Sequence, residues 1–334
     1  MNVPDGLIER LTSWRRAVIV GHVTPDADCL GSMIALAKGL ADDRRCEVTV
    51  SLPPGSVSQR LAFILDQADP ALADPRAFAE ADGIVVVDTA KVSRCNVDRS
   101  IPDNWADGKT VINIDHHASN TRFGDINWVE AEASSTAEMV YWLLLRANRS
   151  LSPMLCSLLY AGMITDTVGF TLSSTAPGTL RVAGEVVAQG ADVAQIGERM
   201  YRSLTAGEFR LLQTIYANTR VVADGRIAYS TADHDEITGA GCTAADIDDQ
   251  VNVPRSLRGV KIAMLLTEGV RGKTRINFRG ESGVEVLELA RSLGGGGHAE
   301  AAGAILDMPI DQAVPLVVAR TTEYVDRLSG GSDS

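Results

Sequence analysis

Three ionisable side chains lie close together in residues 21–32, which read GHVTPDADCLGS. They are His22, Asp26 and Asp28. The segment follows an apolar run and precedes a helical pattern, and α/β sheets bind ligands at such a strand-to-helix turn. Proline disfavours a helical residue before it, so Thr24-Pro25 predicts an extended turn in which the three side chains converge. Helix capping is the alternative, but it accounts for one aspartate and not for the histidine.

Two further aspartates stand at the ends of apolar segments. Asp88 closes the run IVVVD, and Asp166 follows the apolar helical pattern Pro153–Ile164. An acid after a strand is either an ordinary loop residue or part of a site at the carboxyl edge of the sheet. An acid after a helix indicates nothing by itself. Asp88 and Asp166 therefore indicate a functional site only when they are considered together with the other clusters.

Three consecutive ionisable residues follow another apolar run, in the sequence VINIDHHASN. They are Asp115, His116 and His117. Burying three such groups in a row is unfavourable without partners, and the chain has only five histidines. Adjacent side chains on an extended backbone face opposite ways, so we expect one histidine to bind a metal and the other to reach the substrate. A solvated loop is the alternative.

Six of these residues together form a set of oxygen donors with a minority of imidazoles. The set is His22, Asp26, Asp28, Asp88, His116 and Asp166. Such donors suit Mn(II) or Mg(II), and they are too many for one catalytic ion that keeps open positions. They suit two divalent cations about 3.5–4 Å apart with a shared carboxylate, for which Asp88 is our candidate. Such a pair would form a bridging hydroxide near neutral pH and stabilise an in-line displacement at phosphorus.

Four glycines in a row lie near the carboxyl end, in the sequence LGGGGHAEAAG. The run predicts a loop whose backbone N–H groups face an anion, followed by His298 and by small residues that can start a helix. A flexible turn without a ligand is the alternative. Residues 251–280 carry seven lysines and arginines against one glutamate. We interpret most of them as a solvated face and only Arg279, between a strand and the glycine loop, as a ligand-binding residue.

The elements that position these residues alternate between strands and helices in the first half. The predicted strands are Ala17–Gly21, Glu47–Leu52, Ile84–Asp88 and Val111–Asp115. The predicted helices are Cys29–Leu40, Val57–Leu65, Ser135–Arg146, Pro153–Ile164 and Pro177–Gln189. This alternation predicts an α/β fold with an N-terminal, mostly parallel sheet that has helices on both faces.

The second half predicts a helical connector and a smaller C-terminal α/β domain. The connector contains the helical patterns Ile196–Leu204 and Ala206–Asn218. The smaller domain contains the strands Arg226–Thr231, Lys261–Leu266 and Thr274–Phe278, followed or interleaved by the helices Val284–Leu293 and Asp311–Leu328. We therefore place a catalytic domain at residues 1–190, the connector at 191–219 and a substrate-binding domain at 220–330.

The composition narrows the class of protein. The 334 residues carry a formal net charge of −12, which argues against long duplex nucleic acid as a partner, since that binding needs many cationic contacts. The five cysteines are odd in number and have no CxxC spacing, which argues against disulfides and structural zinc. No stretch approaches the roughly 18–20 apolar residues of a membrane helix, and the polar N-terminus lacks a signal core. We expect a cytoplasmic protein without membrane contact.

Taken in order, HVTPDADCLGS, VVVDT, DHHASN and TDTVGF resemble the four motifs of the DHH phosphoesterase superfamily. The glycine run resembles the GGGH loop of the DHH-associated domain, so the resemblance covers nearly the whole chain. One Mn(II) would then be held by His22, Asp26 and Asp88. The other would be held by Asp28, Asp88, His116 and Asp166.

The same resemblance assigns the remaining site residues. His117 would contact the scissile phosphate, and Asp115 would orient the neighbouring histidines, so these two are the catalytic candidates. The candidate substrate contacts are Asn120, Arg279, Gly295, Gly296, Gly297 and His298. The active site would lie in a cleft between the domains.

Within the superfamily, the chain resembles the compact nanoRNase and 3′-phosphoadenosine 5′-phosphate phosphatase group. The resemblance implies a Mn-dependent phosphoesterase with a two-metal mechanism. Its substrates would be short oligoribonucleotides, linear or cyclic dinucleotides, or 3′-phosphoadenosine 5′-phosphate. The alternatives are an inorganic pyrophosphatase and a non-catalytic nucleotide-binding regulator. The preferred substrate and a homodimer both stay open.

Overall fold

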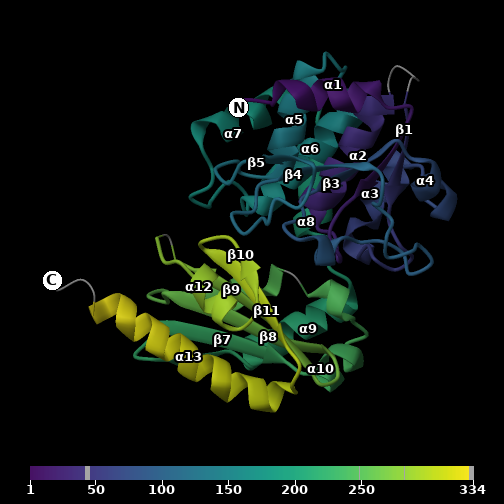
Figure 1. The fold of residues 1–334 in the computed structure, drawn as a ribbon. Coiled ribbons are helices and arrows are strands. Elements are labelled where there is room, and N and C mark those ends of the chain that lie inside the picture. Colours follow the sequence, from purple (N-terminus) through teal and green to yellow (C-terminus); the bar gives the residue numbers. More distant parts are fainter. Residues whose placement is uncertain (42–45, 248, 282, 331–334) are drawn as a thin grey trace. The chain divides into compact units, whose positions relative to one another are not determined.

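A computed structural model describes residues 1–41, 46–247, 249–281 and 283–330 (Figure 1). The chain divides into two compact units, Met1–Ser203 and the residues from Leu204 onward. Each unit has its own hydrophobic core. No helix among the described residues is long and apolar enough to cross a membrane.

Five parallel strands form the sheet of the first unit, in the order β2-β1-β3-β4-β5. They are β1 (Arg16–Val20), β2 (Glu47–Ser51), β3 (Gly83–Val87), β4 (Thr110–Asp115) and β5 (Ile126–Val129). The chain leaves β1 for β2 on one side and then returns to place β3 on the other side. The strand order therefore reverses between β1 and β3, and ligands bind at the carboxyl ends of strands at such a switch point.

Helices cover both faces of this sheet, as the alternating pattern predicted. They are α1 (Asp5–Ser13), α2 (Ala27–Ala41), α3 (Ala62–Ala68), α4 (Pro75–Glu80), α5 (Thr136–Arg146), α6 (Pro153–Asp166), α7 (Pro177–Ala188) and α8 (Val193–Tyr201), with the short 3₁₀ helices η1 (Gln59–Leu61) and η2 (Val92–Arg94). Ile19 and Val85 pack on one face into the core shared with α2, α5 and α6. Val18 and Ile84 pack on the other face with Phe78 of α4. Burial on both faces explains why these strands are apolar throughout.

Two glycines let α2 and α6 approach closely. A Cβ added at Gly31 would lie 2.7 Å from the carbonyl oxygen of Leu158 on α6. A Cβ added at Gly162 would lie 2.6 Å from Asp28 Oδ1 and 2.6 Å from the Cβ of Ala137. Since real Cβ atoms do not come this close, the contact between the two helices needs glycine at both positions.

Six strands form the mixed sheet of the second unit, in the order β10-β11-β9-β8-β7-β6. They are β6 (Arg220–Val222), β7 (Ile227–Ala232), β8 (Ile262–Val270), β9 (Lys273–Gly280), β10 (Gly296–Gly297) and β11 (Ala301–Leu306). Among the described residues of this sheet, β7 and β8 pair in parallel and the other neighbouring strands are antiparallel. The second α/β domain that we predicted is therefore confirmed as a mixed-sheet domain.

Helices also lie on both faces of this second sheet. They are α9 (Ala206–Ala217), α10 (His234–Gly239), α11 (Asn252–Arg255), α12 (Leu287–Ser292) and α13 (Ile310–Gly330), with η3 (Ala244–Asp246) and η4 (Asp249–Val251). Ile276 and Phe278 of β9 pack with α12 and α13. Leu265 of β8 faces the other way and packs with α9, α10 and α11.

The structure differs from the predicted elements at several places. Strands β5, β6 and β10 and helices α1 and α4 had not been predicted, and the pattern Val57–Leu65 forms η1 and then α3. The small-residue run after His298 was predicted to start a helix, which is wrong, because Ala301–Leu306 is the strand β11 paired with β9. The boundary between the units falls at Ser203, so α8 belongs to the first unit and α9 to the second. A separate connector at 191–219 stays a prediction.

Candidate metal centre

His22 and Asp88 meet at the switch point of the first sheet. His22 lies two residues beyond β1 and Asp88 directly beyond β3. His22 Nε2 lies 3.4 Å from Asp88 Oδ2, while Nδ1 of the same ring lies 2.8 Å from the carbonyl oxygen of Val23. The carbonyl contact orients the ring so that Nε2 faces the carboxylate, as in histidines that bind metals.

The amino end of α5 holds Asp28. This residue lies in the first turn of α2, and its side chain is buried. Its Oδ2 accepts a hydrogen bond from the backbone N–H of Thr136 and its Oδ1 one from the N–H of Ala137, both at 2.8 Å. The first N–H groups of a helix have no partner inside the helix and favour negative charge, so α5 stabilises the buried carboxylate. The hydroxyl of Thr136 also donates to Asp88 Oδ1 at 3.0 Å.

His116 gathers three carboxylates around one nitrogen. Its Nε2 lies 3.4 Å from Asp166 Oδ2, 3.6 Å from Asp88 Oδ1 and 3.8 Å from Asp28 Oδ2. Its Nδ1 lies 3.2 Å from the carbonyl oxygen of Ala133. Asp166 reaches the group because it is the last residue of α6. An acid at a helix end gave no reason by itself to expect Asp166 at this site, and it was the TDTVGF motif that placed it in the predicted ligand set.

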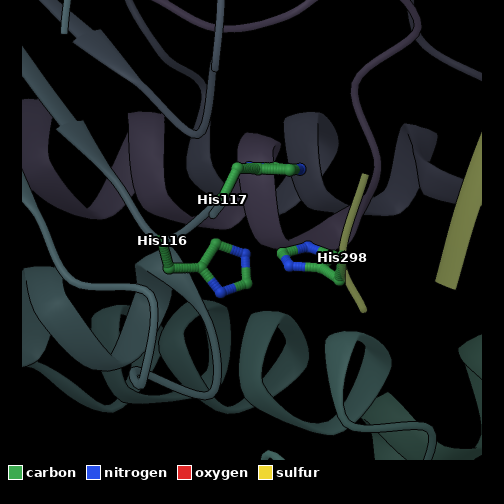
Figure 2. A group of neighbouring side chains, drawn as sticks. All are labelled: His116, His117 and His298. Atoms are coloured by element: carbon green, nitrogen blue, oxygen red, sulfur yellow. The ribbon is translucent and has the colours of Figure 1, made fainter. Parts of the chain in front are cut away.

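His117 lies beside His116, with ring centroids 5.1 Å apart and planes inclined by 70°. Figure 2 shows the two rings leaving the chain just after β4; its third labelled residue, His298, belongs to the second unit. His117 Nδ1 lies 2.7 Å from Asp115 Oδ1 and 3.6 Å from Asp88 Oδ1. Both histidines therefore approach Asp88. Our expectation that they face opposite ways is wrong, because His116 Nε2 and His117 Nδ1 each lie 3.6 Å from the same atom, Asp88 Oδ1.

Asn120 holds Asp115 in position through a hydrogen bond. Its amide nitrogen donates to Asp115 Oδ2 and, at 2.8 Å, to the side-chain oxygen of Asn113. Asn113 is fully buried in β4 and donates to the carbonyl oxygens of Val86 and Thr89. Asn113 was not predicted as a site residue, although a polar residue inside an apolar strand is a signal that could have identified it. A substrate contact at Asn120 stays a prediction.

Asp26 and Cys29 complete the surroundings of His22. Asp26 Oδ1 accepts the N–H of Cys29 at 3.0 Å and lies 3.9 Å from His22 Nε2, so capping of α2 and proximity to the site occur together. The Cys29 thiol is fully buried, and its sulfur accepts the N–H of His22 at 3.3 Å. The predicted extended turn is wrong, since Thr24 has a left-handed φ of 54°.

The charges of these groups depend strongly on one another. Burial and the nearby carboxylates of Asp88 and Asp166 raise the pKa of Asp28 well above its usual range. Burial raises the pKa of Asp166 to about 6. Burial acts in the same direction on Asp88, but the His22 hydrogen bond and the neighbouring imidazoles outweigh it and leave the pKa of Asp88 far below its usual range.

Burial acts on the three imidazoles in the opposite direction, but neighbouring groups raise their pKa values overall. Burial would lower the pKa of His116, but the carboxylates of Asp166 and Asp88 raise it overall. Burial likewise opposes charging of His117, and Asp115 with Asp88 raises its pKa. The pKa of His22 is raised against burial by Cys29, Asp88 and Asp26. Without a cation, protons therefore balance the buried carboxylates.

The donor set fits divalent cations. Ligand atoms of Asp28, His116 and Asp166 lie within 4.8 Å of one another, and so do those of His22, Cys29 and Asp88. Within the part of the chain that the structure describes, imidazoles are the ion-pair partners found for Asp28, Asp88 and Asp166. Carboxylates gathered without lysine or arginine need positive charge from another source, and oxygen donors with imidazole suit Mn(II) or Mg(II).

The glycine loop of the second unit makes more backbone hydrogen bonds than a flexible turn would. Gly294 and Gly295 close the end of α12 through their N–H groups, and Gly296 and Gly297 pair with β11 as strand β10. A Cβ at Gly295 would lie 2.0 Å from the carbonyl oxygen of Gly303, and Gly297 has a φ of 139°. Glycine is thus needed here for close backbone packing.

His298 and Arg279 lie at the same end of this second sheet. The N–H of His298 donates to the carbonyl oxygen of Ala301 at 2.8 Å, and Ala301 is the cross-strand partner of Arg279. Both side chains are half-buried. His234 is half-buried, and its Nδ1 lies 3.3 Å from the carbonyl oxygen of Gly269.

Known families account for both units. Residues 16–163 match the model of the DHH family, N-terminal domain, and residues 224–326 match the DHHA1 domain. The chain is 30% identical to the bifunctional oligoribonuclease and PAP phosphatase NrnA of Thermus thermophilus over 311 residues, which are 92% of this chain and 90% of that protein. The chain belongs to the DHH family, and it is a phosphoric ester hydrolase.

Two further proteins are similar over nearly their whole length. The bifunctional oligoribonuclease and PAP phosphatase NrnA of Bacillus subtilis is 27% identical, with 89% of this chain and 91% of that protein covered. The crystal structure of an exopolyphosphatase-related protein from Bacteroides fragilis is 26% identical and has a TM-score of 0.82, with 97% of this chain and 96% of that chain covered. The resemblance to DHH phosphoesterases that the motifs indicated is confirmed.

Proposed function

We propose that this protein is a Mn(II)-dependent phosphoesterase of short nucleotides. Its substrates would be oligoribonucleotides of a few residues, linear or cyclic dinucleotides, or 3′-phosphoadenosine 5′-phosphate. The observation that carries the proposal is the cluster around Asp88, where three imidazoles and a hydroxyl approach one buried carboxylate at the switch point of the sheet. The names of the two NrnA relatives support the choice of substrate.

The proposed ligands divide into two groups that share Asp88. The first group is His22, Asp26 and Asp88. The second group is Asp28, Asp88, His116 and Asp166. When bound, two divalent cations supply an activated water nucleophile and part of the positive charge that a phosphate needs in an in-line displacement.

The chain's own residues orient the reaction. Asp115 accepts a hydrogen bond from His117 Nδ1 and so fixes that ring, which leaves Nε2 as the atom to donate to the scissile phosphate. The raised pKa of His117 favours the protonated ring, which stabilises negative charge developing on the phosphate oxygens. In the second unit, Arg279, His298 and the glycines 295–297 would hold the part of the substrate away from the scissile bond.

A turnover panel tests the proposal. Metal-free protein is supplied with Mn(II), and hydrolysis is measured for pApA, cyclic di-AMP, 3′-phosphoadenosine 5′-phosphate, a short RNA and pyrophosphate. We expect turnover of at least one nucleotide substrate and its loss in Asp88→Asn, which keeps the side-chain shape. Turnover that survives Asp88→Asn would contradict a shared carboxylate.

The two alternatives give different results in the same panel. An inorganic pyrophosphatase would hydrolyse pyrophosphate and keep that activity in Arg279→Ala. A non-catalytic regulator would bind nucleotides without turnover at any Mn(II) concentration. Either result would replace the proposed function.

A further inference from the structure

The two proposed metal positions differ in the softness of the donor atoms around them. At the first position, ligand atoms of His22, Cys29 and Asp88 all lie within 4.8 Å of one another, so one of the donors is a sulfur. The corresponding group at the second position is Asp28, His116 and Asp166. This second group offers carboxylate oxygen and imidazole nitrogen. Donors bound to one cation through bonds of about 2.0–2.3 Å lie roughly 3.5–4.5 Å apart, so separations of this order are compatible with a shared cation.

The first turn of α2 brings the Cys29 sulfur to the end of β1. The sulfur is fully buried and accepts the backbone N–H of His22 at 3.3 Å, and the N–H of Cys29 donates to Asp26 Oδ1 at 3.0 Å. A Cβ added at Gly21 would lie 2.3 Å from this sulfur, so glycine is needed there for the sulfur to lie beside His22. One short segment therefore holds a sulfur, an imidazole and a carboxylate together.

A buried thiol can also act as a small apolar side chain, and the chain provides a direct comparison. Cys156 of α6 is fully buried in the same unit, and its sulfur lies 4.0 Å from the carbonyl oxygen of Leu151. Among the described residues, Cys156 joins no group of potential metal ligands. Cys29 is equally buried, but its sulfur lies with the imidazole of His22 and the carboxylate of Asp88. Burial alone therefore does not account for the position of Cys29.

We propose that Cys29 is a sulfur ligand of the first metal position, and that this position selects Zn(II) or Co(II) while the second selects Mn(II). The donors of the first position would be His22, Asp26, Cys29 and Asp88. Four donors of nitrogen, oxygen and sulfur are the number and type that Zn(II) binds. Sulfur favours softer cations, and the affinity of such sites rises from Mn(II) to Co(II). The thiol proton passes to solvent when the cation binds.

The inference rests on the two ligand groups of the proposed function and adds to them a centre of two unlike metals. The second position, with three carboxylates and one imidazole, keeps the hard donors that suit Mn(II). The shared carboxylate of Asp88 would then join a softer cation to a harder one. The metal at the first position would depend on a single side chain, which makes the inference open to a direct test.

Cobalt spectroscopy tests the sulfur ligand. Metal-free protein is titrated with Co(II), whose bond to a thiolate gives a near-ultraviolet charge-transfer band that carboxylate and imidazole ligands do not give. We expect this band in the unmodified protein and its loss in Cys29→Ser, which keeps the size of the side chain but offers oxygen. Two controls should keep the band. They are Cys156→Ser and Cys95→Ser, which changes the half-buried residue that forms an isolated β-bridge with His22.

Metal selectivity gives a second measurement that does not depend on activity. Calorimetry on the metal-free protein should show that Cys29→Ser weakens binding of Zn(II) and Co(II) at least about tenfold, and binding of Mn(II) less than about threefold. Protein given one equivalent of Zn(II) and then Mn(II) should show the electron paramagnetic resonance spectrum of a Mn(II) ion that is not coupled to a second Mn(II). Coupled Mn(II) pairs in that sample would contradict the selectivity.

The outcomes separate this inference from the proposed function. A missing Co(II) band in the unmodified protein, or a band that persists in Cys29→Ser, would overturn the sulfur ligand. Equal losses of affinity for Mn(II), Co(II) and Zn(II) in Cys29→Ser, with a lowered melting temperature, would show that Cys29 only packs. If Cys29→Ser does not fold, Cys29→Ala repeats the test without adding a polar atom. A band that depends on Cys29 in a protein without nucleotide turnover would leave the inference standing while the proposed function fails.

Discussion

Thr136 connects the two carboxylates on which the site depends. Its backbone N–H binds Asp28 and its hydroxyl binds Asp88. Asp88 has a left-handed φ of 51°, which is uncommon for a residue other than glycine and is retained only where neighbouring contacts compensate it. The N–H of Asp88, which donates to the carbonyl oxygen of Ile114 at 2.9 Å, is a second such contact. A residue outside the ligand set therefore helps to set the position of the shared carboxylate.

We predict that Thr136→Val lowers the affinity for Mn(II) about tenfold or more, since residues that orient metal ligands have effects of this size. Valine keeps the shape of threonine and the N–H that binds Asp28, so only the hydrogen bond to Asp88 is lost. Titration calorimetry on the metal-free protein measures the effect, and Thr136→Ser, which keeps the hydroxyl, is the control. Equal affinities for all three proteins would contradict a positioning role.

The raised pKa of Asp166 predicts that Mn(II) binding depends on pH. With a pKa of about 6, this carboxyl is protonated in much of the metal-free protein below pH 6 and ionised above pH 7. A cation must displace that proton, so affinity should be lowest at pH 5.5, rise through pH 6 and level off for this group above pH 7. The raised pKa values of His22, His116 and His117 act in the same direction.

Calorimetry in buffers of different ionisation enthalpy measures this proton release directly. We expect at least a partial proton released per bound Mn(II) at pH 6 and less at pH 8. An affinity that stays constant between pH 5.5 and 7.5 would show that the carboxyl groups are already ionised without metal.

At the scale of elements, the packing of α2 on α6 determines where Asp28 lies. Gly162 of α6 faces Asp28 so closely that any larger residue would meet its carboxylate oxygen. A change in the contact between α2 and α6 would therefore also change the position of Asp28. The same packing brings the end of α6, and with it Asp166, to the site.

We predict that Gly162→Ala lowers both stability and metal affinity. The added methyl group should destabilise the first unit by about 1–3 kcal/mol, as overpacking does, and should displace Asp28. Gly184→Ala on α7 is the control, because no atom lies within 4 Å of its Cβ position, and there alanine should be neutral or stabilise by up to about 1 kcal/mol. Chemical denaturation and Mn(II) titration measure the two effects. An unchanged Mn(II) affinity in Gly162→Ala would show that Asp28 tolerates the shift.

Features that depend on the local sequence could be predicted, whereas features that depend on contacts between elements could not. The ends of β3 and β4 were predictable because their apolar runs stop at an aspartate, and the end of β1 because its run stops at Gly21, just before His22. The left-handed backbone at Thr24 and Asp88 was not, because tertiary contacts and not local preference hold it. Strand β11 was missed because alanine favours a helix and both alanine and glycine are depleted in strands, so its conformation comes from pairing with β9. Asn113 was missed because its partners lie in other segments of the chain.

At the scale of the whole molecule, the six proposed metal ligands all belong to the first unit, while the glycine loop and Arg279 belong to the second. The two units have separate cores. Part of the net charge of −12 is the carboxylate group that the cations would neutralise. Metal binding should therefore be a property of one unit, and retention of the substrate's far end a property of the other.

This division predicts that Mn(II) stabilises the two units unequally. A ligand that binds only the folded state at 100 times its dissociation constant adds about 2.7 kcal/mol of stability. Hydrogen exchange measured by mass spectrometry should therefore slow in peptides from α2, β3 and α5 when Mn(II) is added. Peptides from β8, β9 and α13 should be unchanged, and Asp88→Asn should remove the difference. Equal protection of peptides from both units would show that the metal acts on the second unit as well, which the positions of its ligands along the chain do not predict.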